Sequence, residues 1–280
     1  MPELAEVETV RNVLKEKILH KKILDIKIIY PKMIESNIDD FKTHLIGDEF
    51  IDIKRKGKYL IFETNKNYLI SHLRMEGKYF IKDKKEEINK HEHVIFYFKD
   101  FTLRYHDTRK FGRMNLIKKE DLENYFENIG PDANSNIDKT YLYNKIKNKN
   151  IPIKTLLLDQ SIISGLGNIY VDEVLFKAKI NPYIHGNKLN ENDCNNILIA
   201  SKEILEKAIK YKGTTIRSYT SSLGVYGEYQ KYLNVHTKDI CPVCNSIIAK
   251  EKIGGRSTYF CPNCQRSTWE QILLRQLYIF

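Results

Sequence analysis

The sequence predicts an α+β chain of several domains: a β-rich N-terminal part, a helical middle part and a small metal-binding module. Three observations support this prediction. Short strand-like stretches, either apolar and β-branched or alternating and separated by polar turns, occupy much of the first 115 residues. An amphipathic helical stripe lies near residue 200, and four of the five cysteines fall in the last 40 residues. The length of 280 residues allows one large domain or two ordinary domains with a buried core.

The β-rich part begins with a helix. Residues 4–18 are predicted to form this helix. Its apolar residues between Val7 and Ile18 recur at helical spacing and so share one face. Strand patterns follow, and the polar turns between them predict hairpins. The expected strands are residues 23–30, a hairpin of 59–64 with 68–73, and a second hairpin of 93–99 with 101–105, while residues 82–90 form a charged loop.

The sequence Gly130-Pro131-Asp132 interrupts this pattern, and the next 20 residues are rich in Asn, Lys and Asp. We therefore place a domain boundary there, with a hinge near residues 130–150. The predicted domains are 1–130, 131–235 and 236–280. In the middle domain an apolar stripe from Ile197 to Ile209 predicts an amphipathic helix that Gly213 terminates, and residues 214–235 resemble a long loop.

The C-terminal cysteines form two C-x-x-C pairs. The first pair is Cys241 with Cys244 and the second is Cys261 with Cys264, and sixteen residues lie between Cys244 and Cys261. Two such knuckles place four thiolates around one ion, the closed tetrahedral arrangement of structural zinc. The sequence therefore predicts one structural zinc ion. The fifth cysteine, Cys194, is expected to be a buried thiol without a chemical role.

The charge and the termini limit the possible partners and location. A formal net charge of +10 and a pI of about 9.1 favour a polyanionic partner, either nucleic acid or an anionic membrane surface, although a merely basic protein would have the same charge. No stretch of 18 or more apolar residues suggests a transmembrane helix. Residues 1–10 carry three glutamates and lack the apolar core of a signal peptide, so we expect a cytosolic protein.

The N-terminal sequence Met1-Pro2-Glu3 offers a specific chemistry. Removal of Met1 would leave Pro2 with a free secondary amine, and an α-amino group has a pKa of roughly 8. Such an amine is nucleophilic near neutral pH and attacks aldehyde-level carbon such as C1′ of a sugar. By itself a Met-Pro start is weak evidence, because most such starts have no catalytic role.

The N-terminal segment together with the cysteine module resembles the formamidopyrimidine-DNA glycosylase family, bifunctional enzymes that remove oxidised purines. The similarity covers essentially residues 2–266 and implies an N-terminal β-sandwich with a leading helix, a helix–two-turn–helix domain and a zinc-finger hairpin. The segments that carry it are Pro2–Thr9, Lys56–Leu60, Ser71–Gly77, His106–Gly112, Leu156–Glu173 with its Gly165–Tyr170 core, Asn181-Pro182 with Cys194, and Arg256–Cys261.

The resemblance implies a role for each matching residue. Pro2 is the implied Schiff-base nucleophile, Glu3 the proton donor and acceptor, and Lys58 a participant in elimination. The other implied roles are phosphate contact and the second elimination for Arg256, shaping of the damaged-base pocket for Glu6, DNA contact for His91, Arg109 and Asn168, and filling of the gap left by a flipped nucleotide for Met75, Arg109 and Phe111.

Each of these residues also has an ordinary interpretation. Lys58 taken alone would be a solvated strand lysine, and Met75 and Phe111 would normally be core residues. Glu8 is expected to be structural, as are the histidines at 72, 93 and 106. Three features depart from the family: Ala5 replaces a usual proline, residues 235–239 are poorer in glycine, and an apolar tail, Ser267–Phe280, extends past the usual end. The tail suits a docking helix, an interaction surface or a frayed end.

The implied function is base excision repair in the bacterial cytosol or nucleoid. A monomer would flip 8-oxoguanine or a formamidopyrimidine out of damaged double-stranded DNA, excise it through a Schiff base on Pro2, and cleave the strand by β- and δ-elimination. Three alternatives stay open: the sister branch for oxidised pyrimidines, a non-catalytic DNA- or RNA-binding zinc protein, and a ribosome-associated zinc ribbon. The start Pro2–Glu6 and the long loop at 214–235 favour the purine branch.

Overall fold

The computed structural model describes residues 2–214 and 226–265. The chain divides into two compact units. One comprises residues 1–128 together with 209–230, and the other comprises residues 129–208 together with 231–280. No helix in the described ranges is long and apolar enough to cross a membrane.

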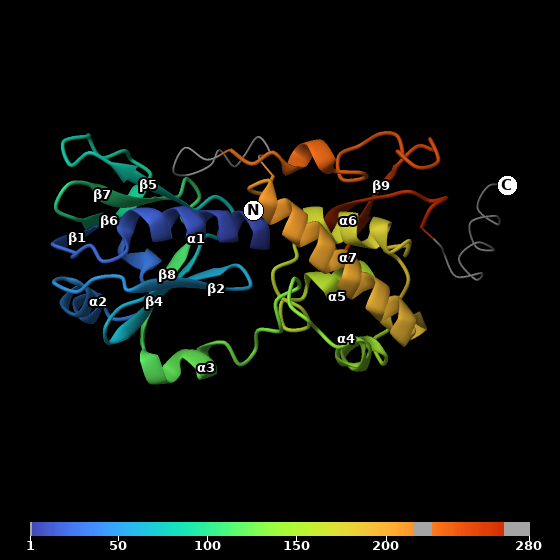
Figure 1. The fold of residues 1–280 in the computed structure, drawn as a ribbon, viewed down its shortest axis with the longest axis horizontal. Helices are drawn as coiled ribbons and strands as arrows, with labels where there is room; N and C mark the ends of the chain where they lie inside the picture. Colours follow the sequence, from blue (N-terminus) through green and yellow to red (C-terminus); the bar gives the residue numbers. More distant parts are fainter. Residues whose placement is uncertain (1, 215–225, 266–280) are drawn as a thin grey trace. The chain divides into compact units, whose positions relative to one another are not determined.

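The first unit is a sandwich of two four-stranded antiparallel sheets (Figure 1). One sheet has the strand order β1-β6-β7-β5 and the other has the order β2-β3-β4-β8. The elements of this unit are α1 (Leu4–Ile18), β1 (Asp25–Ile28), η1 (Pro31–Met33), α2 (Ile38–Leu45), β2 (Asp52–Lys56), β3 (Tyr59–Glu63), β4 (Asn67–His72), β5 (Lys78–Lys82), β6 (Glu92–Tyr97), β7 (Thr102–His106), β8 (Arg113–Lys118), η2 (Lys119–Asp121) and α3 (Leu122–Tyr125).

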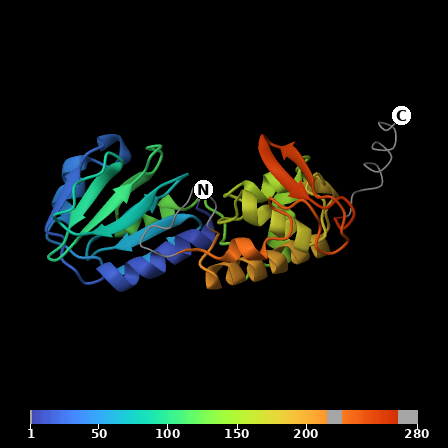
Figure 2. The same cartoon turned by 90° about the horizontal axis from the view of Figure 1, so that it is seen from above.

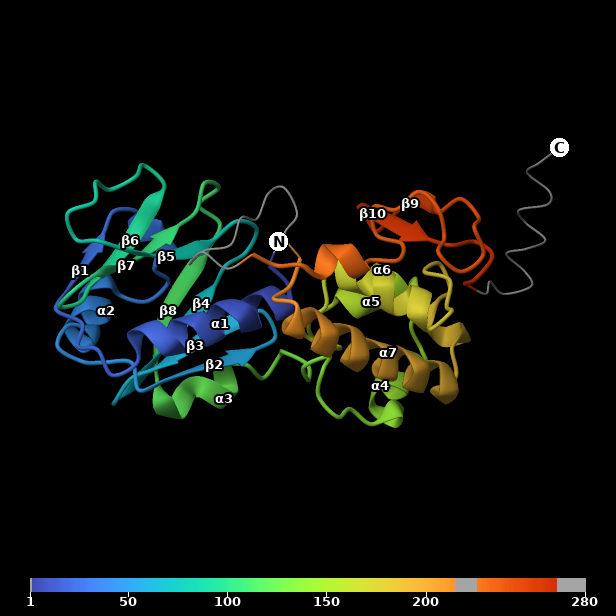
Figure 3. The ribbon, with the colours of Figure 1, turned by 45° about the horizontal axis from the view of Figure 1, so that its top comes forward.

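The sandwich core consists of aliphatic and aromatic side chains from both sheets and from α1. Phe50 packs against Phe62 and Phe96, with ring centroids 5.1 and 6.1 Å apart. From α1, Val7 and Leu14 are fully buried in the same cluster. The helix lies next to β2 (Figure 3), and the predicted nucleophile lies at its start. Burial of one face of α1 therefore fixes the position of the N-terminal residues.

The second unit is helical and ends in a two-stranded hairpin. Figure 2 shows the hairpin as two red strands beside α6. The elements are α4 (Lys139–Ile146), α5 (Ile153–Leu158), α6 (Asn168–Lys177), η3 (Gly186–Lys188), α7 (Glu191–Lys210), η5 (Tyr229–Tyr232), β9 (Ala249–Ile253) and β10 (Arg256–Phe260), of which the end of α7 and the start of η5 group with the first unit.

Most predicted elements are confirmed. The first helix spans the expected residues, both expected hairpins form, and the apolar stripe lies on α7. Gly213 follows α7 with a φ of +78°, as expected of a helix terminator. The structure thus confirms the predicted α+β fold, with a β-sandwich, a helical region and a cysteine-bearing hairpin.

Two predictions need correction or lie partly outside the described residues. The expected hinge near residues 130–150 contains a helix, α4, because Asp138 caps its N-terminus and Leu142 and Ile146 are fully buried. The predicted loop 214–235 contains the short η5 at its end, and residues 215–225 lie outside the described residues. The division into domains at residues 130 and 235 stays a prediction.

Candidate functional site

Pro2 and Glu3 lie at the start of α1. Pro2 is buried, and Glu3 is the N-cap residue and only 2% exposed. The Glu3 backbone N–H donates to Glu6 Oε2 at 2.9 Å, which is one half of a capping box. The first turn is therefore fixed by the helix cap. Met1 is outside the described residues, so the free amine of Pro2 stays a prediction.

The other carboxylate oxygen of Glu6 holds a distant part of the chain. Glu6 Oε1 accepts hydrogen bonds from the backbone N–H of Thr214 at 2.7 Å and from its hydroxyl at 3.1 Å. Gly213 makes this contact possible, since a Cβ at that position would lie 2.6 Å from Glu6 Oε1. Glu6, predicted to shape the base pocket, therefore fixes the point at which segment 215–225 begins.

Lys58 lies in the turn between β2 and β3 and is 5% exposed. A chain of polar contacts connects this turn to α1: Glu8 Oε2 accepts from Arg55 Nε at 2.8 Å, and Arg55 Nη1 donates to Gly57 O at 2.9 Å. The adjacent arginine guanidiniums lower the pKa of Glu8 despite its partial burial. Glu8 is therefore structural, as expected, and it positions the turn that carries Lys58.

His72 lies on β4 opposite Tyr59 and close to Lys58. The two rings meet edge to face, with centroids 4.5 Å apart. Burial, with the nearby positive charges of Arg74 and Lys58, lowers the pKa of His72 to about 3. Its Nδ1 accepts from the Arg74 backbone N–H at 2.9 Å. His72 is therefore neutral at physiological pH, and it places no imidazolium charge beside Lys58.

The turn after β4 and the turn after β7 are held together. The Thr108 hydroxyl donates to Glu76 Oε2 at 2.6 Å, which links the two turns directly. Beneath them, the Tyr105 hydroxyl lies against the backbone of Gly77 and Gly112, where a Cβ on either glycine would come within 2.1 Å of that oxygen. Only glycine allows both turns to pack on the same tyrosine. Met75 precedes this contact in the first turn.

The second turn displays Arg109 and Phe111. Asp107 is fully buried, and its carboxylate accepts from the backbone N–H of Arg109 at 3.0 Å and of Gly112 at 2.8 Å. The Arg109 guanidinium stacks on the Phe111 ring at 4.6 Å. Phe111 is 47% exposed and Met75 is 39% exposed. The core interpretation of these two apolar residues is therefore wrong, because both side chains lie at the surface of adjoining turns.

His91 adjoins the same turn. Its carbonyl accepts from the Asp107 N–H at 2.9 Å, and its ring lies 5.5 Å from that of His106. The loop before it is held by Arg104, which is 1% exposed and pairs with the equally buried Glu92 at 2.9 Å. The first unit thus brings together four of the predicted DNA-contacting residues: Met75, His91, Arg109 and Phe111.

The structural roles predicted for the histidines agree with these contacts. His93 Nε2 lies 2.8 Å from the Asp107 carbonyl and donates to it. Burial lowers the pKa of both His93 and His106, although the backbone contact opposes the shift at His93. These rings therefore support the turn as neutral groups.

In the second unit, Asn168 is the first residue of α6. Its side-chain amide donates to Ser257 O at 2.8 Å, and its buried Oδ1 has no hydrogen-bond partner in the part of the chain that the structure describes. The same carbonyl oxygen of Ser257, which lies on the hairpin, also accepts a hydrogen bond from Lys154 Nζ at 3.0 Å. Asn168 and Lys154 therefore fix the strand that begins with Arg256.

Two acids on α6 anchor the remaining connections to the hairpin. Asp172 pairs with fully buried Lys154 at 2.7 Å, and its other oxygen accepts from Tyr259 N at 3.2 Å and lies 2.8 Å from His236 Nδ1. Glu173 accepts the backbone N–H groups of residues 234–236. Arg256 itself is exposed beside the two glycines of the hairpin tip. The hairpin thus presents an exposed arginine on a rigid support.

The four knuckle cysteines converge as predicted. Their Sγ atoms all lie within 4.8 Å of one another, and the pairs Cys241–Cys264 and Cys244–Cys261 are separated by 3.8 and 3.4 Å. A tetrahedral zinc with Zn–S bonds of about 2.3 Å requires sulfur–sulfur separations of roughly 3.8 Å. The donor set and its spacing therefore fit one structural zinc ion.

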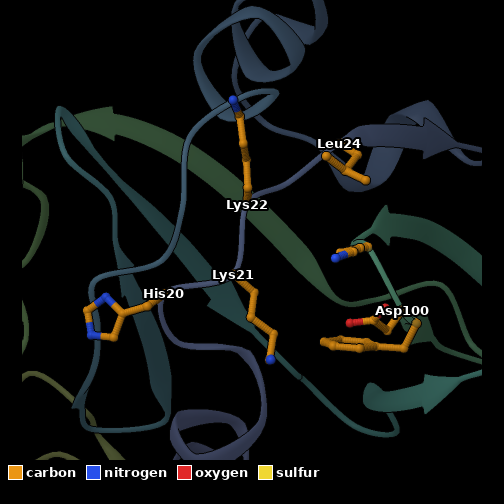
Figure 4. Close-up of a pocket in the computed structure, with 7 residues that line it drawn as sticks. His20, Lys21, Lys22, Leu24 and Asp100 are labelled. Carbon is orange, nitrogen blue, oxygen red and sulfur yellow. The ribbon is translucent and has the colours of Figure 1, made fainter.

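A surface pocket elsewhere on the first unit contains none of the predicted residues. It has a volume of about 400 Å³ and lies between the loop after α1 and the β6–β7 turn (Figure 4). Lys21 and Lys22 line it, but their amines point in opposite directions. The pocket is therefore not part of the candidate site.

Sequence reasoning missed several residues that position the site, namely Arg55, Arg104, Asp107, Lys154, Asp172 and Thr214. Arg104 and Lys154 have no sequence signal, because an isolated basic residue in an element normally faces solvent. Asp107 had a partial signal, since Asp before a Gly-containing turn commonly binds backbone N–H groups.

Comparisons with known proteins agree with this geometry. Family models for the formamidopyrimidine-DNA glycosylase N-terminal domain, its H2TH domain and the zinc finger found in FPG and IleRS match residues 1–114, 129–220 and 240–266. A formamidopyrimidine-DNA glycosylase from Oceanobacillus iheyensis is 44% identical over 95% of this chain and 98% of its own length. One from Streptococcus mutans is 43% identical over 95% of this chain and 100% of its own length.

Solved structures of the Lactococcus lactis enzyme are similar to this chain. A complex of a mutant of that enzyme with Fapy-dG-containing DNA has a TM-score of 0.91 at 42% identity, covering 95% of this chain and 100% of that one. A complex of the Lactococcus enzyme with abasic-site DNA gives the same four values.

Proposed function

Because the chain belongs to the formamidopyrimidine-DNA glycosylase family, we propose that it excises oxidised purines from duplex DNA and then cleaves the strand. The substrates are 8-oxoguanine and formamidopyrimidines. The related proteins carry the glycosylase name over nearly their whole lengths, and the Lactococcus enzyme is solved with Fapy-dG DNA and with abasic-site DNA. The support from this chain's own residues is the pair of joined turns that expose Met75, Arg109 and Phe111.

Pro2 is the proposed nucleophile. After removal of Met1, its unprotonated amine attacks C1′ of the damaged nucleotide, an N–C1′ bond forms, and the bond from C1′ to the base breaks. Glu3 transfers protons during base loss and sugar ring opening. Glu3 follows Pro2 in the sequence and is buried at the helix N-cap, and both observations support this role.

Strand cleavage follows from the iminium adduct. Loss of a C2′ proton expels the 3′ phosphate in β-elimination, and δ-elimination then releases the 5′ phosphate. Lys58 takes part in these steps and Arg256 binds phosphate and assists the second. The polar contacts from α1 through Arg55 to the Lys58 turn support the first assignment, and the exposure of Arg256 at the hairpin tip supports the second.

Damaged double-stranded DNA is the proposed partner, and the enzyme acts as a monomer. A base must leave the stack before it reaches the nucleophile, so Met75 and Phe111 fill the gap while Arg109 meets the unpaired base. His91 and Asn168 contact the backbone, and Glu6 shapes the base pocket by fixing Thr214. The net charge of +10 adds salt-sensitive affinity for phosphate.

The zinc module and the compartment complete the proposal. The zinc finger holds one structural ion through Cys241, Cys244, Cys261 and Cys264, and it serves to present Arg256. Thiolate ligands of this kind suit a reducing cytoplasm. The family matches support domains near residues 1–130, 131–235 and 236–280.

The test is borohydride trapping on a duplex with a single 8-oxoguanine opposite cytosine. We expect a covalent adduct that maps to Pro2 in wild-type protein. Pro2→Gly replaces the secondary amine by a primary amine and should trap slowly, and Glu3→Gln should lose base excision. Glu16→Gln, which alters an exposed carboxylate on the same helix, is the matched control and should behave as wild type.

Two other outcomes would change the proposal. An adduct on oxidised-pyrimidine DNA but not on 8-oxoguanine would move the chain to the sister branch. Failure to trap on any lesion or abasic site, in zinc-loaded protein that lacks Met1, would leave a non-catalytic DNA-binding protein.

A further inference from the structure

The zinc module exposes an unusual amount of apolar side chain. Ile240, Val243 and Ile247 are 53%, 71% and 75% exposed, and the last two are the most exposed large aliphatic residues among those described. Ile240 and Ile247 are partners in an antiparallel bridge, so their side chains share one face. Val243 lies between them in the sequence of the first knuckle, and we call the three exposed residues the knuckle face. Aliphatic side chains gathered in this way usually mark a surface that another segment covers.

The chain supplies a segment of matching chemistry. Eight of the residues 269–280 are apolar, and the only charged residues among them are Glu270 and Arg275. The zinc-finger family match ends at residue 266, so the family fold does not account for this segment. Its apolar composition is unfavourable in water unless another surface buries it.

The described part of the chain ends in the second knuckle, which contacts the first. Asn263 Nδ2 donates to Ser246 Oγ at 2.6 Å, so the second knuckle contacts the first immediately before Ile247. The side chain of Gln265, the last described residue, accepts from the Cys261 N–H and donates to Ile180 O, both at 2.8 Å. An extended chain spans about 3.3 Å per residue. The 15 residues from 266 onward are therefore long enough to reach the knuckle face from Gln265.

We propose that the C-terminal segment Ser267–Phe280 packs over the knuckle face of its own chain and shields the zinc knuckles from water. The contact is thus intramolecular, and it is made by aliphatic and aromatic side chains of the segment against the aliphatic residues of the knuckle face. This inference does not depend on the proposed catalytic function, because it concerns only the zinc module and the segment that follows it.

A second surface lies near the start of the segment, but it fits less well. A pocket between α6 and α7 adjoins Lys179, the neighbour of Ile180. Among its lining residues Ile199 is the one large exposed apolar side chain, and Lys177 and Lys179 flank it. An apolar segment buries more carbon surface on the three aliphatic residues of the knuckle face than between two lysines.

The sole tryptophan of the chain, Trp269, lies in this segment and reports on its surroundings. In full-length, zinc-loaded protein we expect blue-shifted Trp269 emission with little quenching by acrylamide. The double substitution Val243→Asp with Ile247→Asp should shift the emission to that of a free peptide of residues 266–280, and quenching should rise several-fold. Leu24→Asp, at an exposed leucine on the first unit, is the control and should change neither quantity.

Each remaining outcome of this measurement decides against the proposal. Emission in the wild type that already equals that of the free peptide would show an undocked segment. A shift produced by Ile199→Asp but not by the double substitution would place the segment on the α6–α7 pocket. A blue shift that disappears on dilution, together with a dimer in sedimentation, would show that a second copy provides the surface.

Zinc release gives an independent readout. Transfer of zinc to a chromogenic chelator should be several-fold faster in a chain ending at Arg266 than in the full chain. The double substitution should accelerate transfer equally, and adding it to the truncated chain should have no further effect. Additive effects, or release that the truncation leaves unchanged, would overturn the proposal.

Discussion

The β-sandwich and the zinc module hold their candidate functional residues by different means. Among the residues that the structure describes, the sandwich core contains 23 buried apolar residues, whereas the cluster around the zinc knuckles contains five, two of which are metal ligands. Lys58 and Glu6 are therefore positioned by packing and hydrogen bonds. Arg256 depends on a hairpin that a metal ion and the acids of α6 must hold in place. The comparison teaches that the two regions should fail independently and under different conditions.

Removal of zinc should have the largest effect, and it should be confined to one region. A structural zinc site contributes about 10–16 kcal/mol to folding in small metal domains. Cys261→Ser should therefore unfold β9 and β10 and abolish strand cleavage, while the amides of β3 and β4 keep their protection in hydrogen exchange. Cys194→Ala, which removes a buried thiol outside the zinc site, is the control and should retain zinc. Persistent protection of the hairpin without zinc would contradict this division.

The sandwich should fail when its buried charges are broken. Arg104→Met removes the guanidinium that pairs with buried Glu92 and donates to three backbone carbonyls, while Lys82 stays 2.9 Å from the other Glu92 oxygen. We therefore expect a cost of about 3 kcal/mol, the lower end for breaking a buried pair. Urea unfolding should show this loss at unchanged zinc content. Lys54→Met removes an ion pair of 2.6 Å to Glu63, but the lysine is 47% exposed, so it should cost less than about 1 kcal/mol. Equal losses from the two substitutions would refute the role of burial.

Within the sandwich, the turn that displays Arg109 should depend on Asp107. Asp107→Asn replaces one carboxylate oxygen by an amide that cannot accept from the backbone, a loss of about 1.5–3 kcal/mol for a charged hydrogen bond. We expect roughly tenfold weaker binding to an abasic-site duplex in fluorescence anisotropy. Asp100→Asn, in the exposed β6–β7 turn, should bind as wild type. Wild-type affinity in Asp107→Asn would remove this turn from the DNA surface.

The smallest effect concerns His72 and pH. Its pKa is about 3 in the folded chain and about 6.5 when unfolded, so the unfolded chain binds the extra proton as the pH falls below 6.5. The free energy of unfolding of the wild type should therefore decrease between pH 6.5 and pH 5, by on the order of 1 kcal/mol for each pH unit from this group. His72→Asn should lower that slope. Carboxylates with a lowered pKa, such as Glu8, change the free energy of unfolding only when the pH is near or below their ordinary pKa of 4.5.

Measurement of unfolding by urea at several pH values separates these contributions. His93 and His106 also have lowered pKa values, and they contribute equally in wild type and variant. A slope unaffected by His72→Asn would show that this histidine titrates alike in the folded and unfolded chain.

The sequence by itself determined the α+β class, the first helix, both hairpins and the zinc ligands. Each of these depends on short-range patterns: helical spacing in α1, apolar runs on either side of a polar turn in β3 and β4, and two C-x-x-C knuckles. Family resemblance then proposed Pro2, Glu3 and Lys58, which no periodicity reveals. Those patterns are local because helix and strand geometry repeat within a few residues.

Only the tertiary structure decided how the candidate residues are held. The Glu6–Thr214 contact joins residues 208 positions apart, and the Thr108–Glu76 bond joins two turns that each connect one sheet to the other. The burial of Arg104 and Lys154 likewise follows from partners on other elements. A buried charge is stable only where several distant groups converge on it, and that convergence is a property of the packed chain rather than of any local segment.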